Sequence, residues 1–235
     1  MALPFFYTLG ILQNEIQLDE DTSKHVIQVL RMQKGDKLLL TDGKGSKAEA
    51  EIMDDNRKRC TVKVVSVTKE EEKQKKVAIA ISLTKNASRF EWFLEKATEI
   101  GVSEVIPLIC ERTEKEKFRF ERMQGILISA MLQSQQSWMP VLHQPRDFYD
   151  IINTNQFNQK FIAHCLPEKK EQLSEVNSPP ITQPSRLILI GPEGDFTPKE
   201  IEAALSHGFI AVALGETRLR TETAGMVAAT LLCIG

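Results

Sequence analysis

Two polar segments near the C-terminal end hold the residues whose types and spacing could do chemistry. The first is IGPEGDF, residues 190–196, where Gly191 and Gly194 let a backbone approach a ligand closely and Pro192 stiffens the loop. The segment matches neither GxxxxGK[ST] nor GxGxxG, and Pro192 removes a backbone donor that a phosphate cradle would use. It therefore indicates a nucleotide-like ligand that has no pyrophosphate.

The second segment is LGETRLRTETA, residues 214–224, which lies between an apolar run and an apolar helix. Arg218 and Arg220 are two apart in an extended loop, so they point to opposite sides and one can enter a pocket. Taken singly, such charges are usually helix caps or surface ion pairs. Since both segments follow predicted strands and open onto helices, we expect them to face each other across one crevice.

His164 ends another predicted strand of the same crevice, and it is either a ligand contact or a hydrogen-bonded structural histidine. Other chemistries find no support in the sequence. The four cysteines lie far apart and the four histidines lack HExxH spacing, so we expect no protein-built metal site. No GxSxG is present, which argues against a serine nucleophile.

Strands and helices alternate from residue 77 to the C-terminus, as in VAIAISL followed by the helical pattern SRFEWFLEKATEIG. This rhythm predicts an α/β fold with a mostly parallel sheet, helices on both faces and a ligand at the C-terminal strand ends. We expect one helix to start with a capping box of Ser88 and Glu91, and another to start with Thr197 and Glu200. Thr221 is the expected cap of the last helix.

The N-terminal part has a different texture. Short alternating runs between residues 37 and 67, separated by turn signals, predict a small antiparallel sheet or barrel. Ahead of them, Asp21 or Thr22 is expected to cap a short helix. Residues 68–76 are nearly all charged, so the predicted domains are 1–70 and 77–235, joined by a linker at 71–76.

The composition is that of an ordinary globular protein of 235 residues, with 42% apolar and 26% charged residues. No apolar run or signal-peptide pattern indicates export, so we expect a cytoplasmic protein. The net charge of −2 favours no particular partner. A nucleic acid would have to be bound through local basic patches.

LIGPEGDFTPKEI and LGETRLRTETA, one helix and one strand apart, resemble the C-terminal signature of the RsmE-type ribosomal RNA uracil-N3 methyltransferases of the SPOUT superfamily. HVIQVLRMQKGDKLLLTDGKG resembles the N-terminal PUA-like barrel of that family, and KNASRFEWFLEKATEIGVSEVIPLICERTE resembles its first helix and second strand. The resemblance covers essentially the whole chain. GPEG alone is shared by several SPOUT branches, but its combination with LRTETA is much more specific.

The resemblance implies a C-terminal SPOUT domain with a deep trefoil knot, preceded by a small PUA-like β-barrel. It also implies a homodimer, with active sites near the subunit interface, that binds S-adenosylmethionine in the knot loops. The implied cofactor-binding residues, to which the crevice adds His164, are Ile190, Gly191, Pro192, Glu193, Gly194, Leu214, Gly215, Leu219, Arg220, Thr221 and Thr223.

The implied reaction is methylation of N3 of a specific uridine in 16S ribosomal RNA of the small ribosomal subunit. Negative charge spreads onto the uracil oxygens O2 and O4 as the N3 proton leaves, and Arg220 is the expected cation beside them. Glu222 or Glu193 is the expected proton acceptor. The expected RNA contacts are His25, Arg31, Lys34 and Lys44 in the barrel and the basic stretch with Lys115, Arg119 and Arg122.

This chain departs from the family pattern at two places. Asp195 stands where a glycine is usual, and its side chain is expected to alter the loop. Leu132 and Gln136 stand where the family has an acid and an arginine, while Gln133 matches. Trp138 could compensate by base stacking.

Two rivals stay open, and the departures at Asp195 and at the helix end favour the first. One is a SPOUT-like RNA-binding or ribosome-assembly protein without transfer activity. The other is a methyltransferase that acts on a ribose 2'-hydroxyl or on another base, because GPEG cannot identify the acceptor atom.

Overall fold

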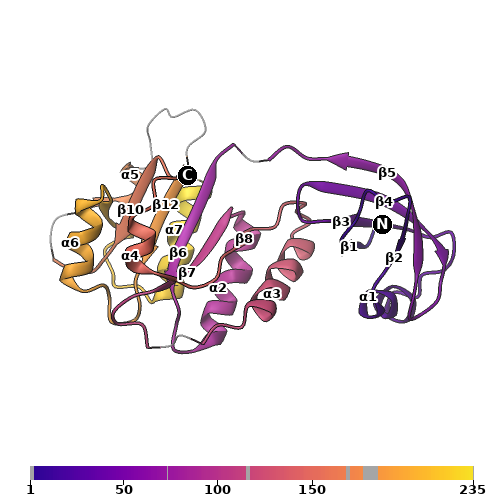
Figure 1. Cartoon of the computed structure of the whole chain (residues 1–235), viewed down its shortest axis with the longest axis horizontal. Helices are drawn as coiled ribbons and strands as arrows, with labels where there is room; N and C mark the ends of the chain where they lie inside the picture. Colours follow the sequence, from indigo (N-terminus) through magenta and orange to yellow (C-terminus); the bar gives the residue numbers. More distant parts are fainter. Residues whose placement is uncertain (1–2, 73, 115–116, 168–169, 177–184, 235) are drawn as a thin grey trace. The chain divides into compact units, whose positions relative to one another are not determined.

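The chain forms two compact units in the computed structural model, which describes residues 3–72, 74–114, 117–167, 170–176 and 185–234 (Figure 1). The N-terminal unit comprises Met1–Glu72 with Met131–Met139. The C-terminal unit comprises Lys73–Ala130 with Pro140–Gly235. The sequence placed residues 131–139 in the C-terminal domain, and the structure differs because this segment packs within the N-terminal unit.

A five-stranded sheet in the order β1-β3-β4-β5-β2 builds the N-terminal unit. β1 pairs with β3 in parallel, whereas the other neighbours are antiparallel. Every second residue of β4 is buried from Ser46 to Ile52, as the alternating sequence pattern predicted. The strands are β1 (Phe5–Tyr7), β2 (Glu15–Gln17), β3 (Lys37–Thr41), β4 (Ser46–Asp54) and β5 (Thr61–Lys69).

A short helix, α1 (Glu20–Lys24), continues into a π-helical turn, η1 (His25–Val29). The expected cap at Asp21 or Thr22 was wrong. Asp19 is the cap, because its extended backbone leaves the carboxylate free to accept a 2.9 Å hydrogen bond from the Thr22 amide. Val26 in η1 is fully buried and joins the core under the sheet.

The segment 131–139 adds to this unit through backbone hydrogen bonds and one aromatic ring. The Gly45 amide donates to the Ser137 carbonyl and the Met139 amide donates to the Gly43 carbonyl, both at 2.9 Å. The Trp138 ring lies against Gly45, where an added Cβ would be 2.4 Å from the ring. Trp138 is half-buried by this contact, and its expected stacking on a base stays a prediction.

An eight-stranded sheet, parallel throughout its described pairings, forms the centre of the C-terminal unit. Its order is β11-β13-β10-β12-β6-β7-β8, with β9 on β7. This confirms the predicted parallel sheet. The strands are β6 (Lys76–Ser82), β7 (Glu104–Ile109), β8 (Val141–Leu142), β9 (Arg146–Asp147), β10 (Gln159–Ala163), β11 (Glu171–Gln172), β12 (Ser185–Ile190) and β13 (Ile210–Ala213).

Helices cover both faces of this sheet, as predicted (Figure 1). On one face, Ala78 and Ala80 of β6 share a core with residues of α4 and α6. On the other face, Gly225 of α7 packs closely on Ile81 of β6 and on Phe93 of α2. A Cβ on Gly225 would be 2.7 Å from each of these side chains. The helices are α2 (Ala87–Ile100), α3 (Phe120–Gln133), α4 (Phe148–Ile152), α5 (Leu173–Val176), α6 (Pro198–Ser206) and α7 (Thr221–Cys233).

The helix starts follow the local sequence with two corrections. α2 is capped by Asn86, which accepts from the Ser88 amide, and not by a box of Ser88 and Glu91. Arg220 is the N-cap residue of α7 and makes no side-chain cap bond, so Thr221 is the first helical residue. The capping box of Thr197 that starts α6 is confirmed.

None of the helices in the described ranges is long and apolar enough to span a bilayer. Likewise, the side chains that the structure describes form no group of three or more metal-ligating residues. The strand order gives the neighbours in the sheet but does not say whether the chain passes through one of its own loops. The implied trefoil knot therefore stays a prediction.

The contact between Gly45 and Trp138 makes a stability prediction. Gly45→Ala should lower the free energy of unfolding by about 2–4 kcal/mol, because a left-handed alanine costs about 1–2 kcal/mol and the ring must shift as well. Gly35→Ala is the matched control, since Gly35 also has a positive φ (+93°) but nothing within 4 Å of its added Cβ. Urea unfolding should show a smaller loss for Gly35→Ala. Equal losses would mean that the Trp138 contact adds nothing.

Candidate functional site

Three neighbouring strands end at the site. Parallel pairing holds Ala163 at the end of β10 opposite Ile190 of β12 and Val212 of β13. Consequently the chain leaves the sheet from adjacent positions into the loops that follow these strands. We name residues 191–195 the glycine loop and residues 214–220 the arginine loop. Their meeting at one crevice confirms that part of the sequence-based prediction.

Two adjoining cavities open among these loops. The glycine-loop cavity has a volume of about 440 Å³, and the arginine-loop cavity has a volume of about 380 Å³. Both volumes lie in the range of small-molecule sites. The two cavities share a wall made by Ala163, Cys165, Arg218, Leu219 and Ala224.

Most of the expected cofactor-binding residues line these cavities. Those on the glycine-loop cavity are Ile190, Gly191, Pro192, Glu193, Leu219, Arg220 and Thr221. Those on the arginine-loop cavity are His164, Leu214, Gly215 and again Leu219. Gly194 and Thr223 are absent from both linings, and the roles of all these residues stay predictions.

The glycine loop packs against its own helix and against the start of α7. A Cβ on Gly191 would be 3.1 Å from the buried Phe196 ring, so a larger residue here would press on that ring. The Thr221 hydroxyl donates a 3.0 Å hydrogen bond to the Gly191 carbonyl. Thr221 therefore joins the end of the arginine loop to the beginning of the glycine loop.

Contacts from the loops after three other strands hold the glycine loop. The Lys85 amide, after β6, donates to Glu193 Oε1 at 3.3 Å. Arg112, after β7, donates from Nη1 to the Gly194 carbonyl at 2.6 Å. The Cys165 amide, after β10, donates to Asp195 Oδ2 at 2.8 Å.

Arg112 was missed by the sequence reasoning. The available signal was its position two residues after the predicted strand VIPLIC, at the carboxyl edge where ligand-binding loops gather.

Asp195 has a left-handed backbone, with φ of +63°. The conformation is the one that glycine adopts readily, and aspartate is among the few other residues that tolerate it. Its Oδ1 accepts a 2.8 Å hydrogen bond from the Phe196 amide. Thus the side chain at this position adds hydrogen bonds and keeps a glycine-like backbone.

Arg89, near the start of α2, lines the glycine-loop cavity and was also missed. Its Nε lies 3.6 Å from Oε1 of Glu222, and Glu222 is only 7% exposed. Oε2 of Glu222 is buried with no hydrogen-bond partner among the described residues. Glu222 is absent from the cavity lining, so it meets the site through Arg89, whereas Glu193 lines the cavity itself.

Cys165 is exposed and lines the wall that the two cavities share. Partial burial, and next the nearby Asp195 carboxylate, raise the pKa of Cys165 above its usual value. A thiol with a raised pKa stays protonated near pH 7 and is a weak nucleophile.

Comparison with known proteins decides the family. Residues 70–233 match the model of the RNA methyltransferase domain, and residues 18–65 match that of the RNA methyltransferase PUA domain. The chain belongs to the RsmE-type RNA methyltransferases. The resemblance seen in the sequence is thereby confirmed, and so is the PUA-like nature of the N-terminal domain.

Among curated relatives of this RNA methyltransferase family, the chain is similar to "Ribosomal RNA small subunit methyltransferase E" of Synechocystis sp. The two are 29% identical over 221 residues, which cover 93% of this chain and 72% of the relative. The protein of the same name from Bacillus subtilis is 29% identical over 215 residues, covering 87% and 84% of the two chains.

Solved structures show the same RNA methyltransferase fold. A probable rRNA methyltransferase from Porphyromonas gingivalis is 41% identical, with a TM-score of 0.91 and coverage of 99% of each chain. A putative methyltransferase from Legionella pneumophila, solved in complex with the cofactor S-adenosylmethionine, is 29% identical. Its TM-score is 0.86, and the match covers 99% of this chain and 97% of that one.

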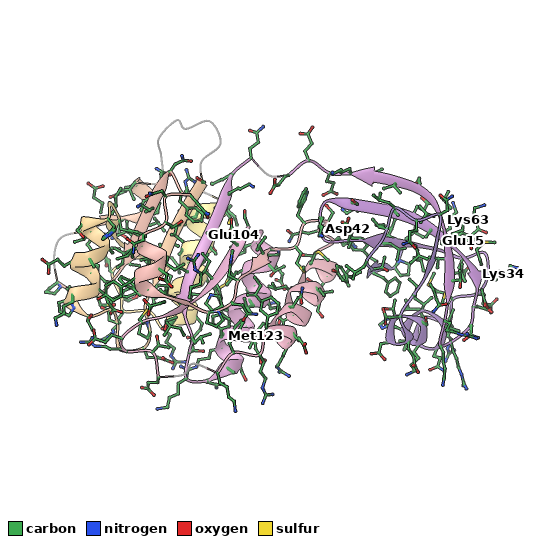
Figure 2. All side chains as sticks on the ribbon, viewed as in Figure 1. Glu15, Lys34, Asp42, Lys63, Glu104 and Met123 are labelled. Atoms are coloured by element: carbon green, nitrogen blue, oxygen red, sulfur yellow. The ribbon has the colours of Figure 1, made fainter. Side chains whose placement is uncertain are left out.

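Several of the expected RNA contacts are exposed in the N-terminal unit. His25, Arg31, Lys34 and Lys44 all lie on its surface, and Lys34 projects outward (Figure 2). His25 makes an edge-on contact with the Phe6 ring, with centroids 5.8 Å apart.

The second group of expected RNA contacts belongs to the C-terminal unit. Arg119 is exposed, whereas Arg122 forms a double hydrogen bond with Glu91, from Nε at 2.6 Å and from Nη2 at 2.9 Å. The Glu91 carboxylate offsets the positive charge of Arg122. Lys115 lies outside the described residues.

The residues that depart from the family pattern near the end of α3 belong to the N-terminal unit with the rest of segment 131–139. The side-chain Nε2 of Gln136 donates to the Ser134 hydroxyl at 2.9 Å. The backbone amide of Gln136 donates to the Met131 carbonyl at 3.0 Å. In this chain these contacts close the end of the helix.

Proposed function

We propose that this protein transfers a methyl group from S-adenosylmethionine to N3 of a specific uridine in 16S ribosomal RNA of the small subunit. The observation that carries the proposal is the pair of adjoining cavities at the ends of β10, β12 and β13. Further support comes from relatives named small subunit methyltransferases and from a similar protein solved with S-adenosylmethionine.

The lining residues suit an adenosine joined to an amino acid. Leu214, Leu219 and Ile190 supply apolar contacts, and Gly191 and Gly215 bring backbone groups close to the ligand. The segment around Pro192 contains no lysine and lacks the phosphate-binding motif GxxxxGK[ST], which fits a ligand without a pyrophosphate. Because the same five residues line part of both cavities, we propose that one elongated molecule occupies the two together.

S-adenosylmethionine supplies an electrophilic methyl group on its sulfonium when it is bound. Uracil N3 becomes nucleophilic as its proton leaves, and the negative charge then spreads onto O2 and O4. Arg220 lines the glycine-loop cavity and is assigned the task of stabilising that charge. The N-terminus of α7, which begins directly after Arg220, adds positive potential of the same sign.

Glu193 is the better placed of the two candidate proton acceptors. It is exposed on the glycine-loop cavity, where a carboxylate can receive the N3 proton and pass it to solvent. Glu222 is buried and faces Arg89. We assign it the role of orienting Arg89 at the cavity and no direct proton transfer.

RNA would be bound by exposed basic residues of both units, with Lys34, Arg31, Lys44 and His25 on one and Arg119 on the other. We further propose that the enzyme is a homodimer with a trefoil-knotted SPOUT domain and that the assembled small subunit or a late precursor is its substrate. A slightly acidic protein has little bulk attraction for free RNA.

The proposed reaction can be tested with labelled S-adenosylmethionine and small subunits from cells that lack the endogenous enzyme. Mass spectrometry of the modified RNA should find label on N3 of one uridine. Label on a ribose hydroxyl or another base would reassign the acceptor. Cofactor binding without incorporation would support an assembly protein instead.

Arg220→Ala should lower the turnover rate on the order of a hundredfold, because the developing uracil charge loses its cation. The affinity for S-adenosylmethionine, measured by calorimetry, should fall much less. Arg220→Lys is the charge-retaining comparison and should keep more activity. If Arg220→Ala turned over normally and only bound the cofactor weakly, its assignment to the reaction would be wrong.

Lys34→Ala should weaken RNA binding and reduce the slope of log affinity against log salt concentration by about 1, as expected for one lost phosphate contact. Arg122→Ala is the matched comparison, because Arg122 is already paired with Glu91. Its removal should leave the slope unchanged. Filter binding across a salt series measures both, and a salt-independent affinity of the unaltered protein would refute phosphate contacts altogether.

A further inference from the structure

We propose that Asp195 is a positioning residue that clamps the glycine loop to the loop after β10 and so preforms the cofactor cavity. The proposal rests on the proposed function for the identity of the ligand. The clamp itself rests on the conformation and hydrogen bonds of Asp195.

The backbone at Asp195 is held in a conformation that few side chains adopt. Three described residues other than glycine have a positive φ, namely Arg31, Gln135 and Asp195. Of these, Asp195 lines a cavity at the strand ends. Since left-handed backbone is disfavoured for residues with a Cβ, the surrounding contacts must offset that cost.

Both carboxylate oxygens of Asp195 accept backbone hydrogen bonds. Oδ1 accepts from the adjacent Phe196 amide and Oδ2 accepts from the Cys165 amide, each at 2.8 Å. The second bond spans 30 residues of sequence and connects the end of β12 to the end of β10. Only a side chain with two acceptor oxygens can make both bonds at once, so asparagine would keep one and glycine neither.

The clamp acts on the wall that the two cavities share. Cys165 lines both cavities, and Asp195 lines the glycine-loop cavity. Phe196 is buried beneath Gly191 and also packs on Phe148, with ring centroids 5.6 Å apart. Asp195 therefore connects a fixed aromatic core on one side to the exposed cavity wall on the other.

The remaining tethers define how large the effect should be. Without Asp195, the loop is still held by Arg112 at the Gly194 carbonyl and by Glu193 at the Lys85 amide. Loss of the clamp should thus loosen one side of the loop without unfolding it. A ligand would then have to order that side on binding, which weakens its affinity.

The test compares Asp195→Gly, Asp195→Asn and the control Glu202→Gln. Glycine keeps the left-handed backbone and removes both hydrogen bonds, whereas asparagine tolerates the backbone and retains one acceptor. Glu202 is an exposed carboxylate on α6, so its change removes the same charge away from the loop.

Asp195→Gly should bind S-adenosylmethionine and S-adenosylhomocysteine about tenfold more weakly by calorimetry. This is the loss expected for one charge-assisted hydrogen bond, since of the two bonds removed only the bond to the Cys165 amide joins the two loops. The KM for S-adenosylmethionine should rise by about the same factor while kcat changes by less than about twofold. Asp195→Asn should fall between, and Glu202→Gln should match the unaltered protein.

Amide hydrogen exchange supplies a readout that needs no ligand. The Cys165 amide should exchange faster in Asp195→Gly than in the unaltered protein, while amides in β6 should be unaffected. If Asp195→Gly showed unchanged affinity for S-adenosylmethionine and unchanged exchange at the Cys165 amide, the clamp would be overturned. The proposed function would still stand if the unaltered enzyme transferred the methyl group. If the unaltered protein bound neither S-adenosylmethionine nor S-adenosylhomocysteine, the proposed function would be refuted. The exchange rate of the Cys165 amide in Asp195→Gly, compared with the unaltered protein, would still test the clamp.

Discussion

Parallel hydrogen bonding at the ends of three strands is the constraint on which the site depends. The register that holds Ala163 between Ile190 and Val212 releases the chain from the sheet at adjacent points. Each loop alone is a short polar connection with little to bind a ligand. Because the strands end together, their loops form two cavities with a common wall, and residues far apart in the sequence become neighbours.

The sheet can hold these loops only because helices on both faces fix it. Gly225 allows α7 to approach β6 and α2 more closely than any side chain would permit. The same helix begins at Arg220 and Thr221, whose hydroxyl bonds to the Gly191 carbonyl. Packing in the core thus sets where the start of α7 meets the glycine loop, and a change at this helix would be transmitted to the cavity.

Backbone groups carry much of the site's organisation. The glycine loop is held through the Gly194 carbonyl and the Lys85 and Cys165 amides. Buried Glu200 has a similar role at the helix that follows, since it accepts from the Thr197 and Glu111 amides. Backbone donors and acceptors cannot be recognised by residue type, which explains why the partners of this loop escaped the sequence reasoning.

The sequence by itself determined the strand and helix rhythm, the capping box at Thr197 and the two polar segments, because these depend on periodicity and on local hydrogen bonding. It also contained the two motifs that identify the family, because each of them is a run of contiguous residues. Only the tertiary structure decided that Arg89 and Arg112 reach the glycine loop region and that residues 131–139 join the N-terminal unit. It likewise decided that Asp195 keeps a left-handed backbone. Such features depend on partners distant along the chain, and no local pattern records a contact across the fold.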